Sequence, residues 1–324
     1  MRVLIVKTSS MGDVIHALPA ISDMASNIPG IQIDWVVEKS FSAMPEQHPA
    51  VNRVIPLQWR KWRKSLRSQE TKAALRAWRK EMAQDQYDLI IDLQGLLKSA
   101  LFGCFATGPR AGYDWRSIRE PIASLFYSRK GRVSRQLHAV DRCRQLCAQL
   151  LNYPLPTTPP DFGLKANHEA WTPGPGKFAV LVPCASRPEK LWPEANWVLV
   201  GKQLKEQGWN IAVMWGSKEE ERLAISIANH IGGEVPPFLT VSQVADTLAQ
   251  AQVVVGLDTG MTHIAAAHGR PTIGIYCDHE PGLAGLVGSN QVISLGGKVQ
   301  APAISDVQDK ISLLLPKTTK RAGK

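Results

Sequence analysis

The feature that most constrains the fold is a strand–turn–helix–strand unit in the second half of the chain. Residues 253–257 form an uninterrupted apolar run, which is typical of a buried parallel strand. A small polar turn at residues 258–263 leads into a short apolar helix, and a second apolar run follows at residues 271–276. Strands joined through a helix in this way lie parallel in an α/β sheet whose faces are covered by helices.

The turn of this unit favours an anion. The first amides of a helix lack intrahelical partners and point at whatever lies above the sheet, so a phosphate is the expected ligand. Gly260 lets the backbone approach closely, while Thr259 and Thr262 add hydroxyl donors. The same residues also fit an ordinary helix start, in which Asp258 or Thr259 caps the helix and His263 only packs.

A second unit of this kind opens the chain. Residues 2–6 form a β-branched run, residues 7–13 form a small polar loop, and residues 14–28 have the apolar spacing of a helix. The loop is neither a G-x-G-x-x-G nor a Walker sequence, which disfavours a dinucleotide-binding enzyme or a P-loop ATPase. Two such loops, one in each half, predict two nucleotide-type domains that bind ligand at the carboxyl ends of their strands.

A proline-rich segment separates the two halves. Six prolines lie between residues 152 and 176, where apolar periodicity is weak. Before this segment we expect helices at 96–106 and 136–151 and strands near 2–7, 32–38, 51–57 and 88–93. After it, strands are expected at 177–182, 211–215 and 253–257. The predicted organisation is an N-terminal domain at 1–155, a linker at 156–176 and a C-terminal domain at 177–324.

Composition limits the class of protein. Apolar residues make up 44% of the 324 residues and charged residues 20%, which is ordinary for a globular protein. There is no run of about 18 apolar residues to predict a membrane-spanning helix, and the N-terminus enters a strand at once, so no signal peptide is expected. Five cysteines without C-x-x-C spacing indicate a reducing compartment and disfavour a structural metal site. The basic tail from Lys317 is expected to fray.

Positive charge is concentrated in the first half. Residues 1–164 hold 23 Lys and Arg against 14 Asp and Glu, a net of +9, whereas residues 165–324 hold 15 against 14, a net of +1. Residues 58–82 alone carry nine Lys and Arg against two Glu, interleaved with three tryptophans. This run suits an acidic glycolipid headgroup, a membrane interface or a nucleic acid. It also fits a solvated helix whose tryptophans pack inward.

Three further loop positions carry candidate residues. Asp13, at the junction of the first loop and its helix, could act as a general base or could cap the helix. Lys190, on the loop after the first strand of the second domain, could neutralise a leaving diphosphate, and Ser186 could add a hydroxyl contact. Glu219, after the following strand, could hold a ribose diol, or the acidic cluster around it could complement the helix dipole.

Five short motifs together resemble those of a known family. They are K-T-S-S-M-G-D-V-I-H-A-L-P at residues 7–19, R-E-P at 119–121, S-L-F-Y at 124–127, K-L-W-P at 190–193 and D-T-G-M-T-H at 258–263. With these motifs the chain resembles the lipopolysaccharide heptosyltransferases of glycosyltransferase family 9 over essentially its whole length. Its first loop is most similar to that of the members that add the first heptose to the inner core.

The resemblance implies the GT-B fold, an α/β architecture in which two Rossmann-like domains with parallel sheets face each other across a cleft. It implies an inverting, metal-independent transferase without a cofactor, which moves heptose from ADP-L-glycero-β-D-manno-heptose to Kdo2-lipid A. The C-terminal domain would bind this donor and the N-terminal domain the acceptor, with the extreme C-terminus packing back on the N-terminal domain. The protein would be cytoplasmic and peripheral on the cytoplasmic face of the inner membrane, and nucleic acid would not be a partner.

The resemblance also implies residue roles, with Asp13 and Lys190 as the catalytic pair. Asp13 would take the proton from the acceptor hydroxyl, and Lys190 would stabilise the departing ADP. The implied donor-binding residues are Ser186, Lys190, Glu219, Leu239, Asp258, Thr259, Gly260 and His263. The implied acceptor-binding residues are Ser10, Arg60, Lys61, Arg63, Lys64 and Arg119. The chain departs from the family at Cys184-Ala185-Ser186, where relatives often have two threonines, and at Leu239, where a methionine lines the adenine site, so the adenine contacts stay open.

Three alternatives remain from the sequence. A nucleic-acid-binding protein would explain the sequence pI of 9.4 and the basic run, and it would show salt-sensitive affinity without sugar transfer. A non-catalytic nucleotide-sugar-binding protein would bind ADP without any turnover that depends on Asp13. Within the enzyme class, the alternative is a heptosyltransferase that acts at another position of the core.

Overall fold

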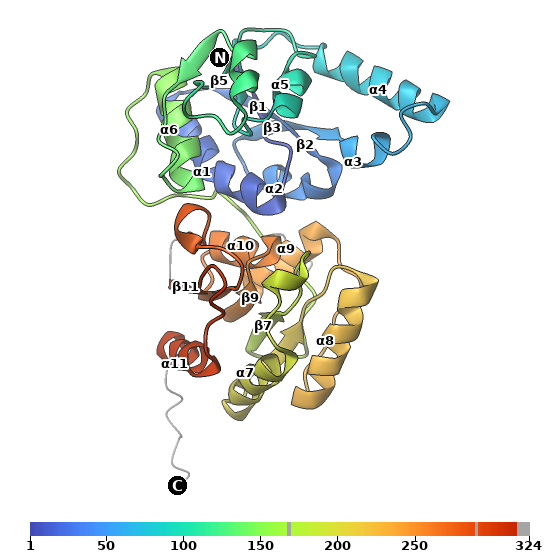
Figure 1. Cartoon of the computed structure of the whole chain (residues 1–324), viewed down its shortest axis with the longest axis vertical. Coiled ribbons are helices and arrows are strands. Elements are labelled where there is room, and N and C mark those ends of the chain that lie inside the picture. The colour runs from blue at the N-terminus through green and yellow to red at the C-terminus, as the bar shows by residue number, and fades with distance from the viewer. Residues whose placement is uncertain (167–169, 289–290, 316–324) are drawn as a thin grey trace. The chain divides into compact units, whose positions relative to one another are not determined.

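The computed structural model describes residues 1–166, 170–288 and 291–315. The chain divides into two compact units, Met1–Lys165 and Ala166–Lys324, and the boundary falls inside the segment 156–176 that was expected to be the linker (Figure 1). Unit 1 carries 24 Lys and Arg against 14 Asp and Glu, a net of +10, whereas unit 2 carries 14 of each. The expectations for the tail from Lys317 concern residues outside the described part.

Unit 1 is built on a six-stranded parallel sheet in the order β3-β2-β1-β4-β5-β6, which is the strand order of a Rossmann fold. β1 forms the centre because its apolar side chains are fully buried on both faces, as an inner parallel strand requires. The strands are β1 (Arg2–Val6), β2 (Gln32–Glu38), β3 (Val51–Leu57), β4 (Leu89–Asp92), β5 (Arg110–Tyr113) and β6 (Arg129–Gly131).

Helices cover both faces of this sheet. α1 (Met11–Asn27) and α6 (Ala139–Leu151) pack against each other. Leu4 and Val6 share a core with Trp78 of α4 (Gln69–Met82) and Phe102 of α5 (Leu97–Gly103), so α4 and α5 lie on one side of β1. The shorter helical elements are α2 (Ala43–Glu46), α3 (Trp59–Trp62), η1 (Lys39–Phe41) and η2 (Pro121–Phe126).

Unit 2 repeats the design with a five-stranded parallel sheet in the order β11-β10-β9-β7-β8. A parallel bridge from Ala212 to Glu234 extends it beyond β8, so the order again follows the Rossmann pattern. The strands are β7 (Phe178–Val182), β8 (Asn210–Val213), β9 (Val253–Leu257), β10 (Thr272–Tyr276) and β11 (Val292–Gly296). The helical elements are α7 (Glu194–Glu206), α8 (Lys218–Ile231), α9 (Val241–Gln250), α10 (Gly260–Ala267), α11 (Ile304–Leu314), η3 (Pro188–Lys190) and η4 (Pro281–Leu283).

The core of unit 2 lies between its sheet and three helices. Trp197 of α7, Ile227 of α8 and Ile311 of α11 are buried against Leu181 and Val255 of the central strands. α9 and α10 pack against each other. The two parallel sheets with covering helices confirm the predicted α/β fold class.

Two expected helices are shorter than predicted. The helix expected at 136–151 begins at Ala139, because the His138 ring nitrogen accepts a hydrogen bond from the Val140 amide at 3.2 Å and caps the helix there. The helix expected at 96–106 ends at Gly103. No helix in the described ranges is long and apolar enough to cross a bilayer.

Candidate active site

Asp13 lies in the first turn of α1, directly after the loop that follows β1. Its Oδ2 accepts hydrogen bonds from the Ser10 amide at 2.8 Å and the Ser10 hydroxyl at 2.9 Å. The helix-start interpretation of Asp13 therefore matches the geometry. The side chain nevertheless stays 39% exposed, with the Lys7 ammonium 3.9 Å from its Oδ1. A fixed carboxylate that still reaches solvent is compatible with a second role as a base.

Hydrogen bonds from the loop that carries Ser10 to residues 92–94 hold this loop in place, and neither Asp92 nor Gln94 was predicted as a site residue. Gln94, after β4, accepts hydrogen bonds from the amides of Thr8 and Ser9 at 3.0 and 3.2 Å. Asp92 in turn accepts a hydrogen bond from the Gln94 amide at 2.8 Å. Lys7 is buried and donates to the Leu93 carbonyl at 3.1 Å. The neighbouring strands β1 and β4 thus position the Asp13 loop jointly.

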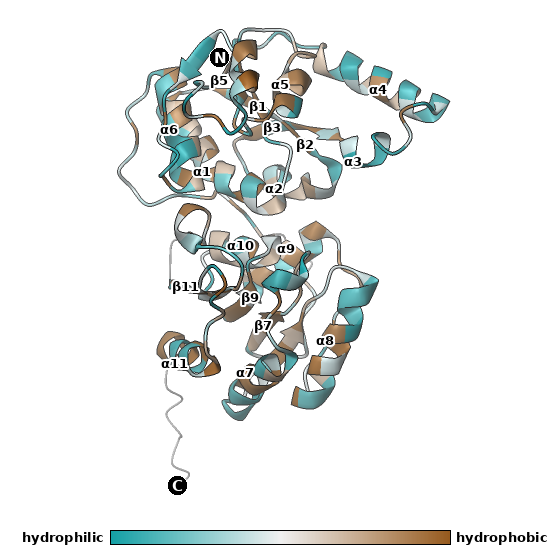
Figure 2. Cartoon of the chain, in the orientation of Figure 1, coloured by the Kyte–Doolittle hydropathy of each residue, from teal (hydrophilic) through white to brown (hydrophobic). Residues whose placement is uncertain are grey.

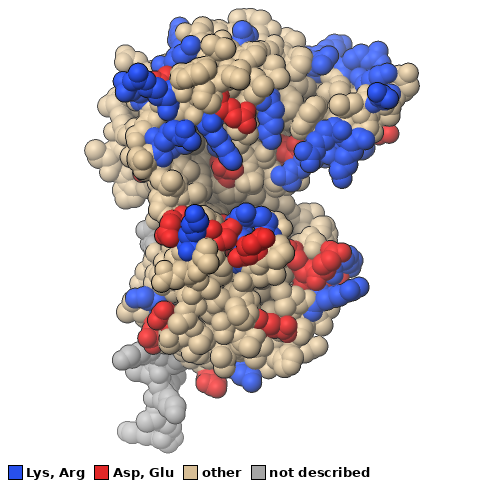
Figure 3. Space-filling model, in the orientation of Figure 1, with Lys and Arg blue, Asp and Glu red and all other residues tan. Residues whose placement is uncertain are grey.

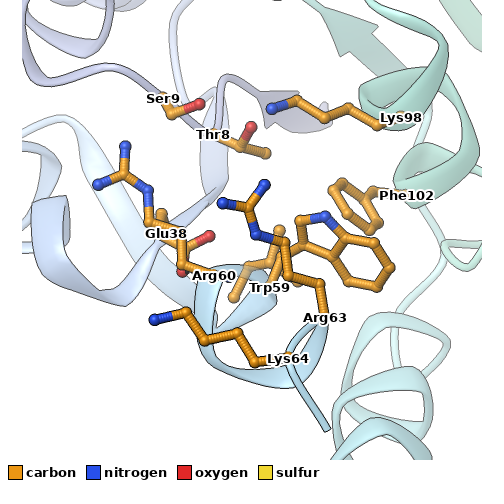
Figure 4. A pocket seen from close by; sticks show the side chains of 10 residues that line it. Thr8, Ser9, Glu38, Trp59, Arg60, Arg63, Lys64, Lys98 and Phe102 are labelled. Atoms are coloured by element: carbon orange, nitrogen blue, oxygen red, sulfur yellow. Dashed lines mark hydrogen bonds between the residues drawn. The ribbon is translucent and has the colours of Figure 1, made fainter. Parts of the chain in front are cut away.

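A pocket of about 370 Å³ opens beside this loop in unit 1. Figure 4 shows Arg63 and Lys98 extending toward Thr8, with Trp59 beside Phe102 forming the apolar wall. We call this site the basic pocket, because four cations line it: Arg60, Arg63, Lys64 and Lys98. Lys98 was not predicted, since only the strand order brings the start of α5 next to the first loop.

Glu38, at the end of β2, is the acidic side chain in the lining of the basic pocket. Burial raises the pKa of the Glu38 carboxyl, and this shift is opposed by the nearby Arg60, whose amide donates to Glu38 at 3.0 Å. The Arg60 guanidinium lies over the Phe41 ring, 4.7 Å from its centroid. Because cations outnumber the single carboxyl four to one, the pocket favours an acidic ligand.

Three expected acceptor residues lie outside the lining of the basic pocket: Ser10, Lys61 and Arg119. Ser10 is the N-cap of α1 and is bonded to Asp13. Lys61 points elsewhere and pairs with Glu70 at 3.1 Å, where both side chains are exposed. Arg119 is exposed just before η2. Its neighbour Glu120 donates its amide to the Gly95 carbonyl at 3.2 Å and accepts the Leu97 amide at 2.7 Å, which places the Arg119 segment beside the loop after β4.

The tryptophans of the basic run pack inward. Trp62 and Trp78 are each 4% exposed, and their rings meet edge to face with centroids 6.3 Å apart. Trp59 packs in the same way on Phe102, at 5.5 Å. Of the interpretations of residues 58–82, the inward-packed helix is therefore correct for the tryptophans, while the cations remain on the surface (Figure 3).

In unit 2, Asp258 is the centre of a cationic cluster after β9. Lys190 forms an ion pair with the Asp258 carboxylate and donates to its main-chain carbonyl at 3.2 Å. His263 lies 3.1 Å from the other carboxylate oxygen. Burial alone would raise the pKa of Asp258, yet the hydrogen bonds and charges of His263 and Lys190 hold it well below its usual range. Asp258 therefore orients two side chains rather than capping α10.

The start of α10 has no side-chain cap. Its N-cap is Thr259, which forms no capping hydrogen bond, and the buried Thr259 hydroxyl has no partner among the described residues. The ordinary-cap interpretation of this turn is wrong, and the amides that begin at Gly260 favour an anion. Thr262 does not supply the expected ligand contact, because its buried hydroxyl donates to the Leu257 carbonyl at 2.6 Å. A Cβ at Gly256 would lie 2.4 Å from that hydroxyl, which explains the glycine.

Three residues of this cluster were missed by sequence reasoning. The His279 Nδ1 lies 2.7 Å from Asp278, while its Nε2 lies 3.5 Å from Asp258. Arg187 pairs with Asp278. Burial would raise the pKa of Asp278, but His279, Lys190 and Arg187 lower it. No motif marks residues 278 and 279, and His279 reaches Asp258 only because β10 lies beside β9.

The remaining donor candidates lie on other loops at this end of the sheet. Ser186 is exposed after β7. Glu219 is exposed in the first turn of α8, whereas Glu220 accepts the Gly216 amide at 2.8 Å and Glu221 pairs with Lys218 at 2.8 Å. All three glutamates lie in the first turn of α8, and Glu220 and Glu221 have partners there, which leaves Glu219 available.

Leu239 is half-buried on the loop before α9. Its neighbour Phe238 is 67% exposed and packs edge-on against Trp215, with ring centroids 5.8 Å apart. This loop therefore offers an apolar surface near the carboxyl end of β8. Such a surface suits a flat heteroaromatic group.

An uncapped helix start beside a partly buried lysine can hold a diphosphate, and a fixed but accessible carboxylate can activate a hydroxyl. On two Rossmann-type sheets, these features define a nucleotide-dependent transferase as the class of protein. The model of "Glycosyltransferase family 9 (heptosyltransferase)" matches residues 75–312. The chain belongs to this family and is a heptosyltransferase.

Individual relatives agree with this assignment. The chain is 44% identical to lipopolysaccharide heptosyltransferase 1 of Escherichia coli K12 over 296 residues, which cover 90% of this chain and 93% of the relative. Its structure is similar to that of E. coli heptosyltransferase WaaC with ADP, with a TM-score of 0.90, 41% identity and coverage of 97% and 100% of the two chains. For WaaC with ADP-2-deoxy-2-fluoro heptose the TM-score is 0.84, with 39% identity and coverage of 97% and 98%.

Proposed function

We propose that this heptosyltransferase moves L-glycero-D-manno-heptose from ADP-heptose to Kdo2-lipid A, with inversion at the anomeric carbon. The observation that carries the proposal is the arrangement at the start of α10, where Lys190 and uncapped amides meet at a site suited to a diphosphate. The similarity to a solved relative that holds ADP supports the donor class. The similarity to heptosyltransferase 1 supports the first position of the inner core.

In the proposed reaction, Asp13 acts as the general base. It removes the proton from the acceptor hydroxyl as the oxygen attacks the heptose anomeric carbon, and the bond from that carbon to ADP breaks. The Ser10 donors fix the carboxylate in place, and Lys7 balances its charge at 3.9 Å. A direct displacement of this kind inverts the configuration at the anomeric carbon.

The departing ADP carries growing negative charge on its diphosphate. Lys190 and the amides at Thr259 and Gly260 would stabilise this charge, and Asp258 with His263 would keep the lysine oriented. Ser186 would add a hydroxyl contact, Glu219 would hold the ribose, and the loop at Leu239 would line the adenine site. Since a lysine supplies the positive charge at the leaving group, the proposed mechanism needs neither metal nor cofactor.

The acceptor would bind in unit 1. Its Kdo carboxylates and lipid A phosphates match the four cations of the basic pocket, and Arg119 would add a further positive charge beside the loop after β4. Lys61 lies outside the pocket and is paired with Glu70, so it would not contact the acceptor. The family assignment favours a glycolipid headgroup over a nucleic acid as the ligand of the basic pocket. We place the enzyme in the cytoplasm, peripheral on the cytoplasmic face of the inner membrane.

The test is incubation of the protein with ADP-heptose and either Kdo2-lipid A or an acceptor that already carries the first heptose. Mass spectrometry should detect one added heptose on Kdo2-lipid A only, and NMR of the product should show the inverted anomer. Transfer should persist in EDTA. Addition to the heptosylated acceptor alone would assign another core position, and ADP binding without any transfer would indicate a non-catalytic binder. A need for Mg²⁺ would contradict the metal-free mechanism.

A further inference from the structure

Three large apolar side chains lie exposed on two touching elements of unit 1. Leu101 of α5 is 44% exposed, and Ile122 and Leu125 of η2 are 58% and 70% exposed. α5 and η2 pack against each other, and the Leu97 amide at the start of α5 is bound by Glu120 just before η2. Single exposed apolar side chains are ordinary, but here three lie on adjoining elements and give them an apolar surface. We call it the α5–η2 surface.

Other residues of α5 and η2 already fill the core, so the three exposed side chains are not needed there. Phe102 of α5 is buried in the core with Trp78, and Ala123 and Ser124 of η2 are buried. α5 is therefore apolar on its core side and also at Leu101 on its outer side. A helix whose outer side faces only water usually carries polar residues there. Figure 2 shows brown turns on α5 beside the mostly teal α4.

Positive charge surrounds the α5–η2 surface. Lys98 and Arg119 lie at one end of it, and Arg129 and Lys130 of β6 follow η2, all of them exposed. α4, whose Trp78 packs on Phe102 of α5, adds a row of further exposed cations on the same side of the sheet: Lys72, Arg79 and Lys80. Of the nearby acidic groups, Glu120 is engaged by the Leu97 amide. Figure 3 shows the Lys and Arg side chains gathered over α3 and α4.

We infer that the α5–η2 surface docks unit 1 on an anionic lipid bilayer. An apolar surface with a cationic rim matches the two layers of a bilayer surface. The Leu and Ile side chains would enter the acyl boundary while the Lys and Arg side chains meet the headgroup phosphates. Trp62 and Trp78 of the basic run cannot do this, since they are buried, and Trp59 packs on Phe102. The net charge of +10 on unit 1 favours a negative surface over a neutral one.

The inference rests on the proposed function in one respect. Lys98 lines the basic pocket, and Leu101 follows it by one helical turn, so the pocket opens next to the docked surface. A lipid-anchored acceptor could then place its sugar in the pocket while its acyl chains stay in the bilayer. A soluble acceptor without acyl chains would gain nothing from docking.

Flotation with vesicles tests the inference. The whole protein is mixed with vesicles of phosphatidylglycerol and phosphatidylcholine, or of phosphatidylcholine alone. The variant Leu101→Ser/Ile122→Ser/Leu125→Ser should bind the anionic vesicles about tenfold more weakly than wild type, because three apolar contacts are lost. The matched control changes three exposed apolar residues of unit 2 instead, as Leu199→Ser/Ile225→Ser/Leu313→Ser. This control should bind the anionic vesicles as wild type does. Wild type should bind phosphatidylcholine vesicles far more weakly than anionic ones.

Transfer to a soluble, deacylated Kdo acceptor separates this inference from the proposed function. Both triple variants should transfer heptose to it at the wild-type rate, which also shows that they are folded. Equal vesicle binding by wild type and the α5–η2 variant would overturn the inference. So would a wild-type dimer that the variant abolishes, since the surface would then join two copies. If wild type fails to transfer to any Kdo acceptor but still needs the surface for vesicle binding, the proposed function is wrong and the docking surface stands.

Discussion

The ion pair between Lys190 and Asp258 makes the sharpest prediction for unit 2. The two side chains are only 15% and 12% exposed, so replacing Lys190 with Met leaves a nearly buried carboxylate without its lysine partner. Removing one member of a buried pair typically costs roughly 3–5 kcal/mol. Asp258 keeps His263 at 3.1 Å and His279 at 3.5 Å, so we expect the free energy of unfolding of unit 2 to fall by a smaller amount, about 2 kcal/mol.

The same variant should weaken ADP binding more than it weakens the fold. One charge-assisted hydrogen bond to a phosphate is worth about 1.5–3 kcal/mol, which corresponds to a loss of about 10- to 100-fold in affinity. Turnover should fall along with affinity, because the lysine meets charge that grows as ADP departs. Lys190→Arg keeps the charge and should retain part of both.

Isothermal calorimetry with ADP and urea unfolding followed by tryptophan fluorescence measure the two effects separately. Lys202→Met is the matched control, since Lys202 is exposed on α7, and it should leave both unchanged. ADP affinity equal to wild type in a folded Lys190→Met protein would refute the assignment of the diphosphate site. An equal loss in Lys202→Met would show that the effect is general electrostatics.

Three further predictions concern unit 1. Asp13→Asn should lower kcat by roughly 10²- to 10⁴-fold with donor affinity kept, measured by steady-state kinetics and ADP calorimetry; an unfolded variant would indicate that capping is its main role. Replacing the three basic-pocket cations of residues 60–64 with Ala should raise the acceptor KM but not the donor KM, with Lys61→Ala as the control, and wild-type acceptor KM should rise with salt. Burial lowers the pKa of His48 to about 4. The free energy of unfolding of unit 1 is therefore highest above the ordinary His pKa of about 6.5, where His48 is neutral in both states. It should fall by up to about 3 kcal/mol as the pH drops from about 6.5 toward 4. Urea unfolding across that range should show a shallower dependence on pH in His48→Gln.

The central strands were predictable because an inner parallel strand must be apolar on both faces. Val253–Leu257 and Arg2–Val6 are read directly from such runs. β5 and β6 were missed, since Arg110–Tyr113 and Arg129–Gly131 are short and contain Arg, Lys or Gly. β5 becomes a strand because β4 offers a free edge for pairing, and β6 then pairs with β5, which is tertiary information.

The candidate site follows the same division. Asp13 and Asp258 could be located from the sequence, because each lies shortly after a clearly apolar strand. Lys98 and His279 could not, because each reaches the site from a neighbouring strand's loop or helix. The role of Thr262 was wrongly assigned because its spacing suited a ligand contact, while the close packing allowed by Gly256 turned its hydroxyl to the Leu257 carbonyl.

Strand order explains why the paired residues meet at all. In an open α/β sheet, loops at the carboxyl ends of two neighbouring strands diverge where the order reverses, and ligands bind there. In unit 1 the reversal lies between β1 and β4, and their loops supply Asp13 and Gln94. In unit 2 it lies between β7 and β9, and their loops supply Lys190 and Asp258. The proposed general base and the proposed diphosphate site thus each lie at the carboxyl end of the strands where the strand order of their unit reverses.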